Sequence, residues 1–349
     1  MLLTGSLAIC ETAIAQKGAN EPWCFVSVPD FLNKDTEFPQ PGFEDHLAYF
    51  LETIKQENPE FLLVPGDLIN GRWPSLLEPT PDAIVKNAEI YYEAWKKRME
   101  YHGLKYYAAL GDHEIGDNPW PPGKAELVPL FKEQFTNYMD PPLNGPGEFR
   151  GTSYYWIKDD VLFISLDVFK QSEDPEVGIE ADVTGDHLKW LKSVFREHQH
   201  VNFRIVMGHT PILGPVNKKH SSGIMLENGV DSELWKVLRR HEVDLYLCGE
   251  VHAITCHEDK GTHQVAHGSL FGWNHTINYL LVENSEDKLK CSLKEIDIIP
   301  IREGRKSLGI NITEESRKEG FHTVGTLSID KSSGKTRTFK SGCFEPDSN

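Results

Sequence analysis

The chain has 349 residues, a formal net charge of −17 and 39% hydrophobic residues, which is enough apolar material for a substantial core. The excess of acid argues against a nucleic-acid surface or an anionic-membrane surface, because both require patches of Lys and Arg. Beyond the N-terminus, no apolar run reaches the roughly 18 residues that a membrane span needs.

The N-terminal segment has features of a secretory signal peptide. A short apolar stretch, residues 2–9, precedes Ala13-Ile14-Ala15, which is the small-x-small pattern that signal peptidase cleaves. No Lys or Arg precedes this stretch, so a mobile terminus is the alternative. We expect a periplasmic or secreted protein, and a cytoplasmic one if residues 1–20 are not a signal. Residues 21–349 are expected to form a single domain, including a β-rich C-terminal segment.

The six cysteines are too few for a fold of this length to be built on disulfides, and none belongs to a Cys-x-x-Cys pair of the kind that binds structural zinc. Cys248 and Cys256 flank the last polar motif of the chain. A disulfide between them and two buried free thiols are both compatible with the sequence.

In the first third of the chain, apolar segments typical of buried strands alternate with helical patterns. The expected strands are residues 25–28, 61–64 and 106–110. The expected helices are residues 43–56 and a segment that Asp82 caps and Gly103 ends. This order predicts a parallel sheet with right-handed crossovers.

The middle of the chain continues with helices and strands, and the last quarter is β-rich. The expected elements are a helix over 125–138, a hairpin of 154–157 with 161–166, helices over 186–198 and 231–241, and strands over 203–207 and 243–248. From Gln264 onward, alternating patterns predict a second, mostly antiparallel sheet, with its last hairpin formed by 323–329 and 335–339. Residues 299–320 are polar, which predicts a loop or an excursion.

Five of the expected strands end in residues that bind metals. These residues are Asp30, Asp67, Asp112 with His113, His209, and Glu250 with His252. Four of the five ends carry a glycine immediately before the polar residue. Because open sheets bind ligands at the carboxyl ends of their strands, the pattern predicts a metal site there, with a bridging carboxylate able to hold two ions.

The order of these motifs resembles the calcineurin-like metallophosphoesterase family, which includes the purple acid phosphatases. The motifs are Asp30, Gly66-Asp67, Gly111-Asp112-His113-Glu114, Gly208-His209 and Gly249-Glu250-Val251-His252, and they span most of residues 26–252. The resemblance implies a four-layer α/β/β/α sandwich with mixed central sheets and a dinuclear metal centre.

The resemblance also implies a role for each matching residue. Asp67 would bridge both ions, Asp30 and His252 would bind the first, and Asp112, His209 and Glu250 would bind the second. His113 would protonate the leaving oxygen, since an imidazole can act as an acid near neutral pH. Arg72 would contact the phosphate. The loop residues Trp120, His220 and Ser222 are candidate substrate contacts.

The chain departs from the family pattern at four positions. Leu32 replaces the histidine of the family's first motif, and Asn70 stands where purple acid phosphatases have a tyrosine ligand. Asp112 and Glu250 replace a neutral Asn and a neutral His. The two added anions favour Mn, Fe, Mg or Ca over Zn, and they make metal-bound water less acidic.

The expected function is metal-dependent hydrolysis of a phosphomonoester or phosphodiester of a small molecule by metal-activated water, with His113 as the general acid. The alternative is a degenerate family member that uses the site for structural metal or ligand binding, which the loss of histidine at Leu32 favours. Hydrolysis of another kind of ester is a third hypothesis, because fold alone does not determine the substrate. The oligomeric state remains open.

Overall fold

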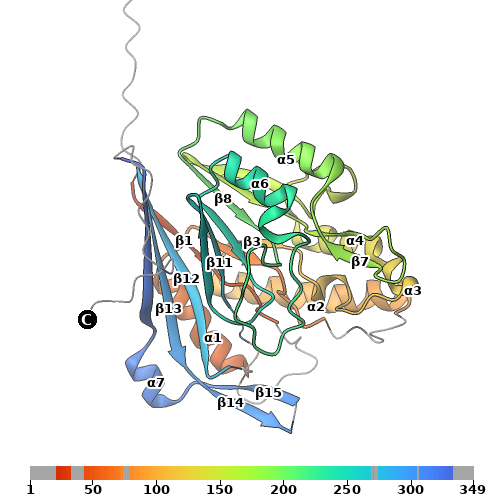
Figure 1. Cartoon of the computed structure of the whole chain (residues 1–349). Helices are drawn as coiled ribbons and strands as arrows, with labels where there is room; N and C mark the ends of the chain where they lie inside the picture. Colours follow the sequence, from red (N-terminus) through yellow and green to blue (C-terminus); the bar gives the residue numbers. More distant parts are fainter. Residues whose placement is uncertain are drawn as a thin grey trace, which may run out of the picture.

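A computed structural model describes residues 21–32, 43–71, 73, 79–268, 270, 274–304 and 306–332 (Figure 1). The expected signal segment 1–20, Arg72 and the expected strand 335–339 lie outside these residues. Two six-stranded sheets dominate the fold, and helices cover their outer faces (Figure 1). Within the part of the chain that is described, no helix is long and apolar enough to cross a membrane.

The first sheet has the strand order β16-β13-β12-β1-β2-β3. Its parallel part consists of β1 (Trp23–Ser27), β2 (Leu62–Pro65) and β3 (Tyr106–Ala109), as the sequence predicts. Its antiparallel part consists of β12 (Thr276–Ser285), β13 (Lys288–Asp297) and β16 (His322–Asp330). Because β12 pairs with β1, the expectation that these C-terminal strands form a separate sheet is wrong.

The second sheet has the strand order β10-β11-β9-β8-β5-β4. The predicted hairpin is formed by β4 (Tyr154–Lys158) and β5 (Val161–Ser165). The remaining strands are β8 (Phe203–Met207), β9 (Leu245–Cys248), β10 (Thr255–Asp259) and β11 (Thr262–Ala266). Strands β5, β8, β9 and β11 are parallel, so their carboxyl ends lie at one edge of the sheet.

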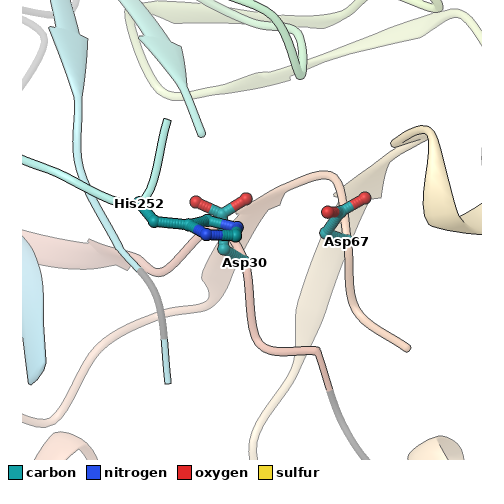
Figure 2. A group of neighbouring side chains, drawn as sticks. All are labelled: Asp30, Asp67 and His252. Atoms are coloured by element: carbon teal, nitrogen blue, oxygen red, sulfur yellow. The ribbon is translucent and has the colours of Figure 1, made fainter. Parts of the chain in front are cut away.

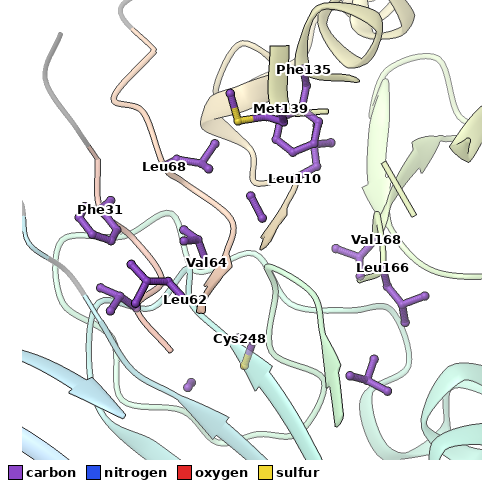
Figure 3. Close-up of a cluster of buried hydrophobic side chains, with 14 of the residues drawn as sticks. Phe31, Leu62, Val64, Leu68, Leu110, Phe135, Met139, Leu166, Val168 and Cys248 are labelled. Carbon is purple, nitrogen blue, oxygen red and sulfur yellow. The ribbon is translucent and has the colours of Figure 1, made fainter. Parts of the chain in front are cut away.

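The two sheets pack face to face. Because successive side chains of a strand point to opposite sides, each strand contributes residues both to the layer between the sheets and to the layer under the helices. Phe25 of β1, Leu63 of β2 and Ile205 of β8 belong to one buried apolar cluster between the sheets. Their chain neighbours Val26 and Leu62 belong to a second cluster with the helices. Figure 3 shows part of this second cluster. The alternation accounts for the predicted four-layer α/β/β/α sandwich with mixed sheets.

Helices α1 (Phe43–Gln56), α2 (Pro81–His102) and α4 (Val128–Met139) pack beside the first sheet, and α5 (Gly185–Glu197) and α6 (Glu233–Arg240) pack beside the second (Figure 1). All five match predicted helices. The N-cap of α2 is Thr80, whose hydroxyl accepts the Ala83 N–H at 3.3 Å, and not Asp82. A short helix, α3 (Pro122–Ala125), lies between α2 and α4 in the sequence.

Smaller elements complete the described chain. Residues 299–320, expected as a loop or excursion, contain the hairpin of β14 (Ile299–Glu303) and β15 (Lys306–Asn311) and the helix α7 (Glu314–Glu319). A second small hairpin consists of β6 (Phe169–Gln171) and β7 (Ile179–Ala181). Cys248 is a free buried thiol and Cys256 is disulfide-bonded, so these two residues do not pair with each other.

Candidate metal centre

The predicted ligands follow directly from the ends of parallel strands in both sheets. Asp30, Asp67 and Asp112 follow β1, β2 and β3, whereas His209 follows β8, and Glu250 and His252 follow β9. All six are buried. Parallel pairing within each sheet collects these side chains at one edge, where the loops of the two sheets meet.

Four of the ligand candidates have left-handed backbone conformations that are uncommon for residues with a side chain. The φ angles are 54° at Asp30, 57° at Asp67, 68° at Glu250 and 52° at His252. Such strain is maintained only where the surrounding structure determines the conformation, and it concentrates at functional sites. The turns after β1, β2 and β9 therefore place their side chains in the site, and the strained backbone conformation costs free energy.

The glycines that precede the polar residues leave room for a ligand from a neighbouring strand. A Cβ atom at Gly111 would lie 2.2 Å from Asp67 Oδ1, and one at Gly249 would lie 2.7 Å from Asp30 Oδ1. Both distances are far below van der Waals contact. Glycine is thus required at positions 111 and 249, because a larger residue would collide with the carboxylate of Asp67 or Asp30.

Two groups of potential ligands share Asp67. One group contains Asp30, Asp67 and His252, the other contains Asp67, Asp112 and His209, and the potential ligand atoms within each group lie within 4.8 Å of one another. Figure 2 shows the first group, with Asp30 and His252 close together and Asp67 beside them. Asp67 is therefore the one residue common to both groups, and its role as a bridge between two ions stays a prediction.

Asp30 carries a buried oxygen that lacks a hydrogen-bond partner. Its Oδ1 atom accepts the backbone N–H of Glu250 at 3.0 Å, whereas Oδ2 is buried and has no hydrogen bond. Burial raises the pKa of Asp30 to about 7, and burial together with the Asp112 carboxylate raises the pKa of Asp67. Bound cations would offset the cost of ionising both groups, so these residues fit a metal centre.

Both imidazoles of the centre are oriented by backbone carbonyls. Nδ1 of His209 donates to Pro65 O at 2.9 Å, and Nδ1 of His252 donates to Lys219 O at 3.1 Å. This leaves Nε2 of each ring as the atom available to a cation. The Asn274 side chain, which is buried, donates to His252 O at 2.7 Å and fixes the backbone of that turn.

The Nε2 atom of His209 is surrounded by carboxylates. It lies 2.9 Å from Asp112 Oδ1, 3.3 Å from Asp67 Oδ1 and 3.4 Å from Glu250 Oε2. Although burial opposes ionisation of both groups, these contacts raise the pKa of His209 and lower that of Asp112. In the absence of metal, protonated Nε2 of His209 would offset the charge of the three carboxylates. A metal cation bound among the same groups would do so as well.

His113, the predicted acid, lies beside the centre and is partly accessible, with 18% of its side chain exposed. Its Nδ1 atom donates to Asn70 O at 2.8 Å, and its Nε2 atom lies 3.9 Å from Asp67 Oδ2. Burial alone would lower its pKa, but Asp67, Asp112 and Asp117 raise it to about 10. These carboxylates therefore favour the protonated ring, which is the form that can donate a proton.

Glu114 has a structural role that the sequence did not reveal. It is fully buried, and its Oε2 atom accepts the backbone N–H groups of Asp67 at 2.9 Å and Gly111 at 2.8 Å. Its Oε1 atom accepts the N–H of Ile69 at 3.3 Å. Glu114 thus ties the turn after β2 to the turn after β3. Its position at the end of the Gly-Asp-His-Glu motif was the available signal.

Asp117 and Asn118 form a wall of the site that sequence reasoning also missed. The Asn118 side chain donates to Asp112 Oδ2 at 3.3 Å, and potential ligand atoms of Asp117 lie near those of Asp112 and His113. The buried Lys124 ammonium holds this loop by donating to Gly116 O at 2.7 Å and to Asp117 O. No periodicity or spacing in the loop indicates this arrangement.

Glu250 accepts hydrogen bonds from residues 221–224, which form the opposite wall of the site. Its Oε1 atom accepts hydrogen bonds from Ser221 Oγ at 2.9 Å, Ser222 Oγ at 2.6 Å, and the N–H groups of Gly223 at 2.6 Å and Ile224 at 2.9 Å. Its Oε2 atom faces His209. One carboxylate thus divides its two oxygens between a loop and the metal centre.

The two walls enclose a cavity of about 290 Å³. Its lining residues are Asp67, Asp112, His113, Asp117, Asn118, His220, Ser221, Ser222, Glu250 and His252. The predicted substrate contacts His220 and Ser222 therefore lie at the cavity.

Other predicted site residues lie elsewhere or cannot be placed. Trp120 is buried in the core, donates to Ile115 O at 3.0 Å and does not line the cavity, so its position does not support a substrate contact. Asn70 contributes its carbonyl to His113, and a ligand role for its side chain stays a prediction. Leu32 is buried, with 2% of its surface exposed. Arg72 lies outside the described residues.

The chain belongs to the calcineurin-like phosphoesterase family, whose profile matches residues 37–253, more than half of the chain. Members of this family bind divalent metals in a dinuclear site. The match begins at residue 37, after both Asp30 and the departure at Leu32. No curated protein matches the chain in sequence.

Solved structures with a similar fold include PhoD, which is 10% identical with a TM-score of 0.56 over 92% of this chain and 73% of PhoD. GAP50, the anchor in the inner membrane complex of Plasmodium, is 18% identical with a TM-score of 0.49 over 84% of this chain and 90% of GAP50. A putative 5′-nucleotidase from Staphylococcus aureus is 16% identical with a TM-score of 0.43 over 85% and 57% of the two chains. At these identities, the likeness to PhoD concerns the fold alone.

Proposed function

We propose that the protein hydrolyses phosphate esters of small molecules in a metal-dependent reaction. The observation that carries this proposal is the pair of ligand groups that share Asp67, with the His113 ring beside them at 3.9 Å from Asp67 Oδ2. A purely structural metal site has no use for a general acid at the edge of an open cavity.

The residues that would hold two ions are Asp30, Asp67 and His252 for one, and Asp67, Asp112, His209 and Glu250 for the other. When bound, such ions supply an acidified water as nucleophile and stabilise the charge that develops on the phosphoryl oxygens. Four carboxylates in this set favour Mn, Fe, Mg or Ca over Zn.

The remaining chemistry belongs to side chains of the protein. His113 donates the Nε2 proton to the leaving oxygen, and the Asn70 carbonyl holds its ring in the required orientation through Nδ1. His220 and Ser222 lie in the wall of the cavity, where they can contact the rest of the substrate. Arg72 is proposed to contact the phosphate from the segment that follows β2.

The test is hydrolysis of an activated aryl phosphate monoester and diester by protein loaded with Mn²⁺ and, separately, with Zn²⁺. We expect turnover with Mn²⁺ to exceed that with Zn²⁺, and metal analysis of the same samples should find two ions per chain. Absence of turnover with every divalent ion, in protein shown to contain metal, would contradict the proposal.

That contrary result would favour the second candidate, a degenerate family member that uses the centre to bind metal or ligand. The observation that favours this candidate is the buried Leu32 where the family motif has a histidine. Binding of Mn²⁺ measured by calorimetry, with no turnover, is its expected signature.

We also propose that the protein is periplasmic or secreted. The disulfide at Cys256 supports this proposal, since disulfides persist mainly in oxidising compartments. Fractionation of cells that express the full chain, with N-terminal sequencing of the product, tests it. Recovery of the uncleaved chain from the cytosol would contradict it.

A further inference from the structure

Negative charge dominates the cavity beside the candidate metal centre. Four of its ten lining residues are acids, namely Asp67, Asp112, Asp117 and Glu250. Among the described residues that line the cavity there is no Lys or Arg. The lining side chains that can carry positive charge are the imidazoles of His113, His220 and His252.

The candidate ligands would cancel the charge of two divalent ions. Asp30, Asp67, Asp112 and Glu250 can supply four negative charges, and two divalent ions would supply four positive ones. The centre itself therefore retains little positive charge with which to attract an anion. Asp117, which belongs to the wall and not to this set of ligands, adds a further negative charge.

The Asp117 carboxylate is held in place beside the acid. Its Oδ1 atom accepts the N–H of Asn118 at 2.7 Å, and the buried Lys124 fixes the backbone of the same loop. Potential ligand atoms of Asp117, Asp112 and His113 lie within 4.8 Å of one another. A substrate whose leaving oxygen approaches His113 therefore brings its phosphoryl group close to this carboxylate.

We infer that the site selects phosphodiesters over phosphomonoesters, with Asp117 as a specificity-determining residue; the inference rests on the proposed function. A phosphomonoester has a second pKa of about 6 and is a dianion above neutrality, whereas a diester carries one negative charge. The second charge of the monoester lies near Asp117 and the other acids of the lining, whereas Arg72, proposed above to contact the phosphate, would act on both kinds of ester. Repulsion between like charges therefore disfavours the ligand that carries the extra negative charge, which is the monoester.

The reaction balances as a simple hydrolysis. The oxygen of water forms a bond to phosphorus, the bond from phosphorus to one ester oxygen breaks, and that oxygen takes a proton from His113, which regains one from the attacking water. The products are an alcohol and a phosphomonoester. Because the monoester becomes a dianion, the charges that exclude it as a substrate also favour its release as a product.

The first test compares p-nitrophenyl phosphate with bis(p-nitrophenyl) phosphate at a pH of about 8, using Mn²⁺-loaded wild type and Asp117→Asn. The amide oxygen of Asn can still accept the Asn118 N–H, so the loop is preserved. We expect Asp117→Asn to raise kcat/KM for the monoester about tenfold and to change the diester much less. Glu173→Gln removes an exposed carboxylate that does not line the cavity and should change neither.

The second test measures binding without turnover, by calorimetry of methyl phosphate and dimethyl phosphate with the same Mn²⁺-loaded proteins. Asp117→Asn should strengthen binding of methyl phosphate several-fold and leave dimethyl phosphate nearly unchanged. Equal effects on both ligands, or wild-type hydrolysis that favours the monoester, would overturn the inference. If neither substrate is cleaved, the proposed function fails, and the binding comparison still decides the role of Asp117.

Discussion

The Asp30 carboxylate accepts the backbone N–H of Glu250 at 3.0 Å, although 220 positions separate the two residues. Asp30 follows β1 of the first sheet, and Glu250 follows β9 of the second. This hydrogen bond therefore joins the loops of both sheets at the point where the candidate ligands meet. Changes on either side of it should affect metal binding and loop order together.

Replacing His113 by Ala should lower kcat by about 10² to 10⁴-fold while the metal content stays the same, because the ring is placed as a proton donor. The loss should be smaller for a p-nitrophenyl leaving group than for an alkyl one, since a good leaving group needs less protonation. Metal analysis and steady-state kinetics check both points. Loss of metal from His113→Ala would instead identify His113 as a ligand.

Replacing Glu250 by Ala should loosen residues 221–224, because it removes the acceptor of four hydrogen bonds. We expect limited proteolysis within this loop to become about tenfold faster, which corresponds to a local opening that is easier by about 1.4 kcal/mol. Glu250→Gln retains an oxygen acceptor and serves as the control. Equal cleavage rates in the two variants would contradict the anchoring role.

Replacing Gly111 by Ala should destabilise the protein by about 2 to 4 kcal/mol and reduce its metal content, because the added Cβ would displace Asp67. Gly123→Ala is a matched control, since a Cβ there meets no atom within 4 Å. Denaturant unfolding and metal analysis of both variants provide the measurement. A Gly111→Ala protein that is as stable and as metal-rich as Gly123→Ala would show that the turn can shift freely.

The buried His187 should make the protein less stable in acid. Burial lowers its pKa from 6.5 to about 4, so the unfolded chain binds the proton more readily between these values. Its contribution to stability is complete above pH 6.5 and decreases as the pH falls towards 4, amounting to a loss of about 2 kcal/mol at pH 5. The ring stacks on Phe149, and its Nε2 atom shares a hydrogen bond of 2.9 Å with Ser153 Oγ.

His187→Phe keeps an aromatic ring on Phe149 and removes the titrating group. The difference in unfolding free energy between about pH 8 and pH 5 should therefore be smaller in this variant than in the wild type, by about 2 kcal/mol. Denaturant titrations at both pH values measure it. An unchanged difference would mean that His187 is not the group that takes up the proton.

The sequence predicts the ligand-bearing turns well because their signals are local. An apolar strand that ends in glycine and a metal-binding side chain can be recognised without knowing its neighbours. Six of the seven ligand candidates, all but Asn70, lie close together, and their role as metal ligands stays a prediction. The pairing of β12 with β1 could not be predicted, because an alternating strand does not specify its partner. The wall formed by Asp117 and Asn118 and the hydrogen bonds from Glu250 to residues 221–224 were missed, because they depend on contacts between loops that have no periodic pattern.

Strand β1 lies between β2 and β12, so it is an inner strand of its sheet only when the C-terminal strands are present. A fragment that stops at residue 253, where the family match ends, would contain every predicted metal ligand but would lack β12, β13 and β16. Its β1 would become an edge strand with unpaired backbone groups and a newly exposed apolar face, which invites aggregation. Any expressed form intended for metal or kinetic work must therefore extend at least through β16.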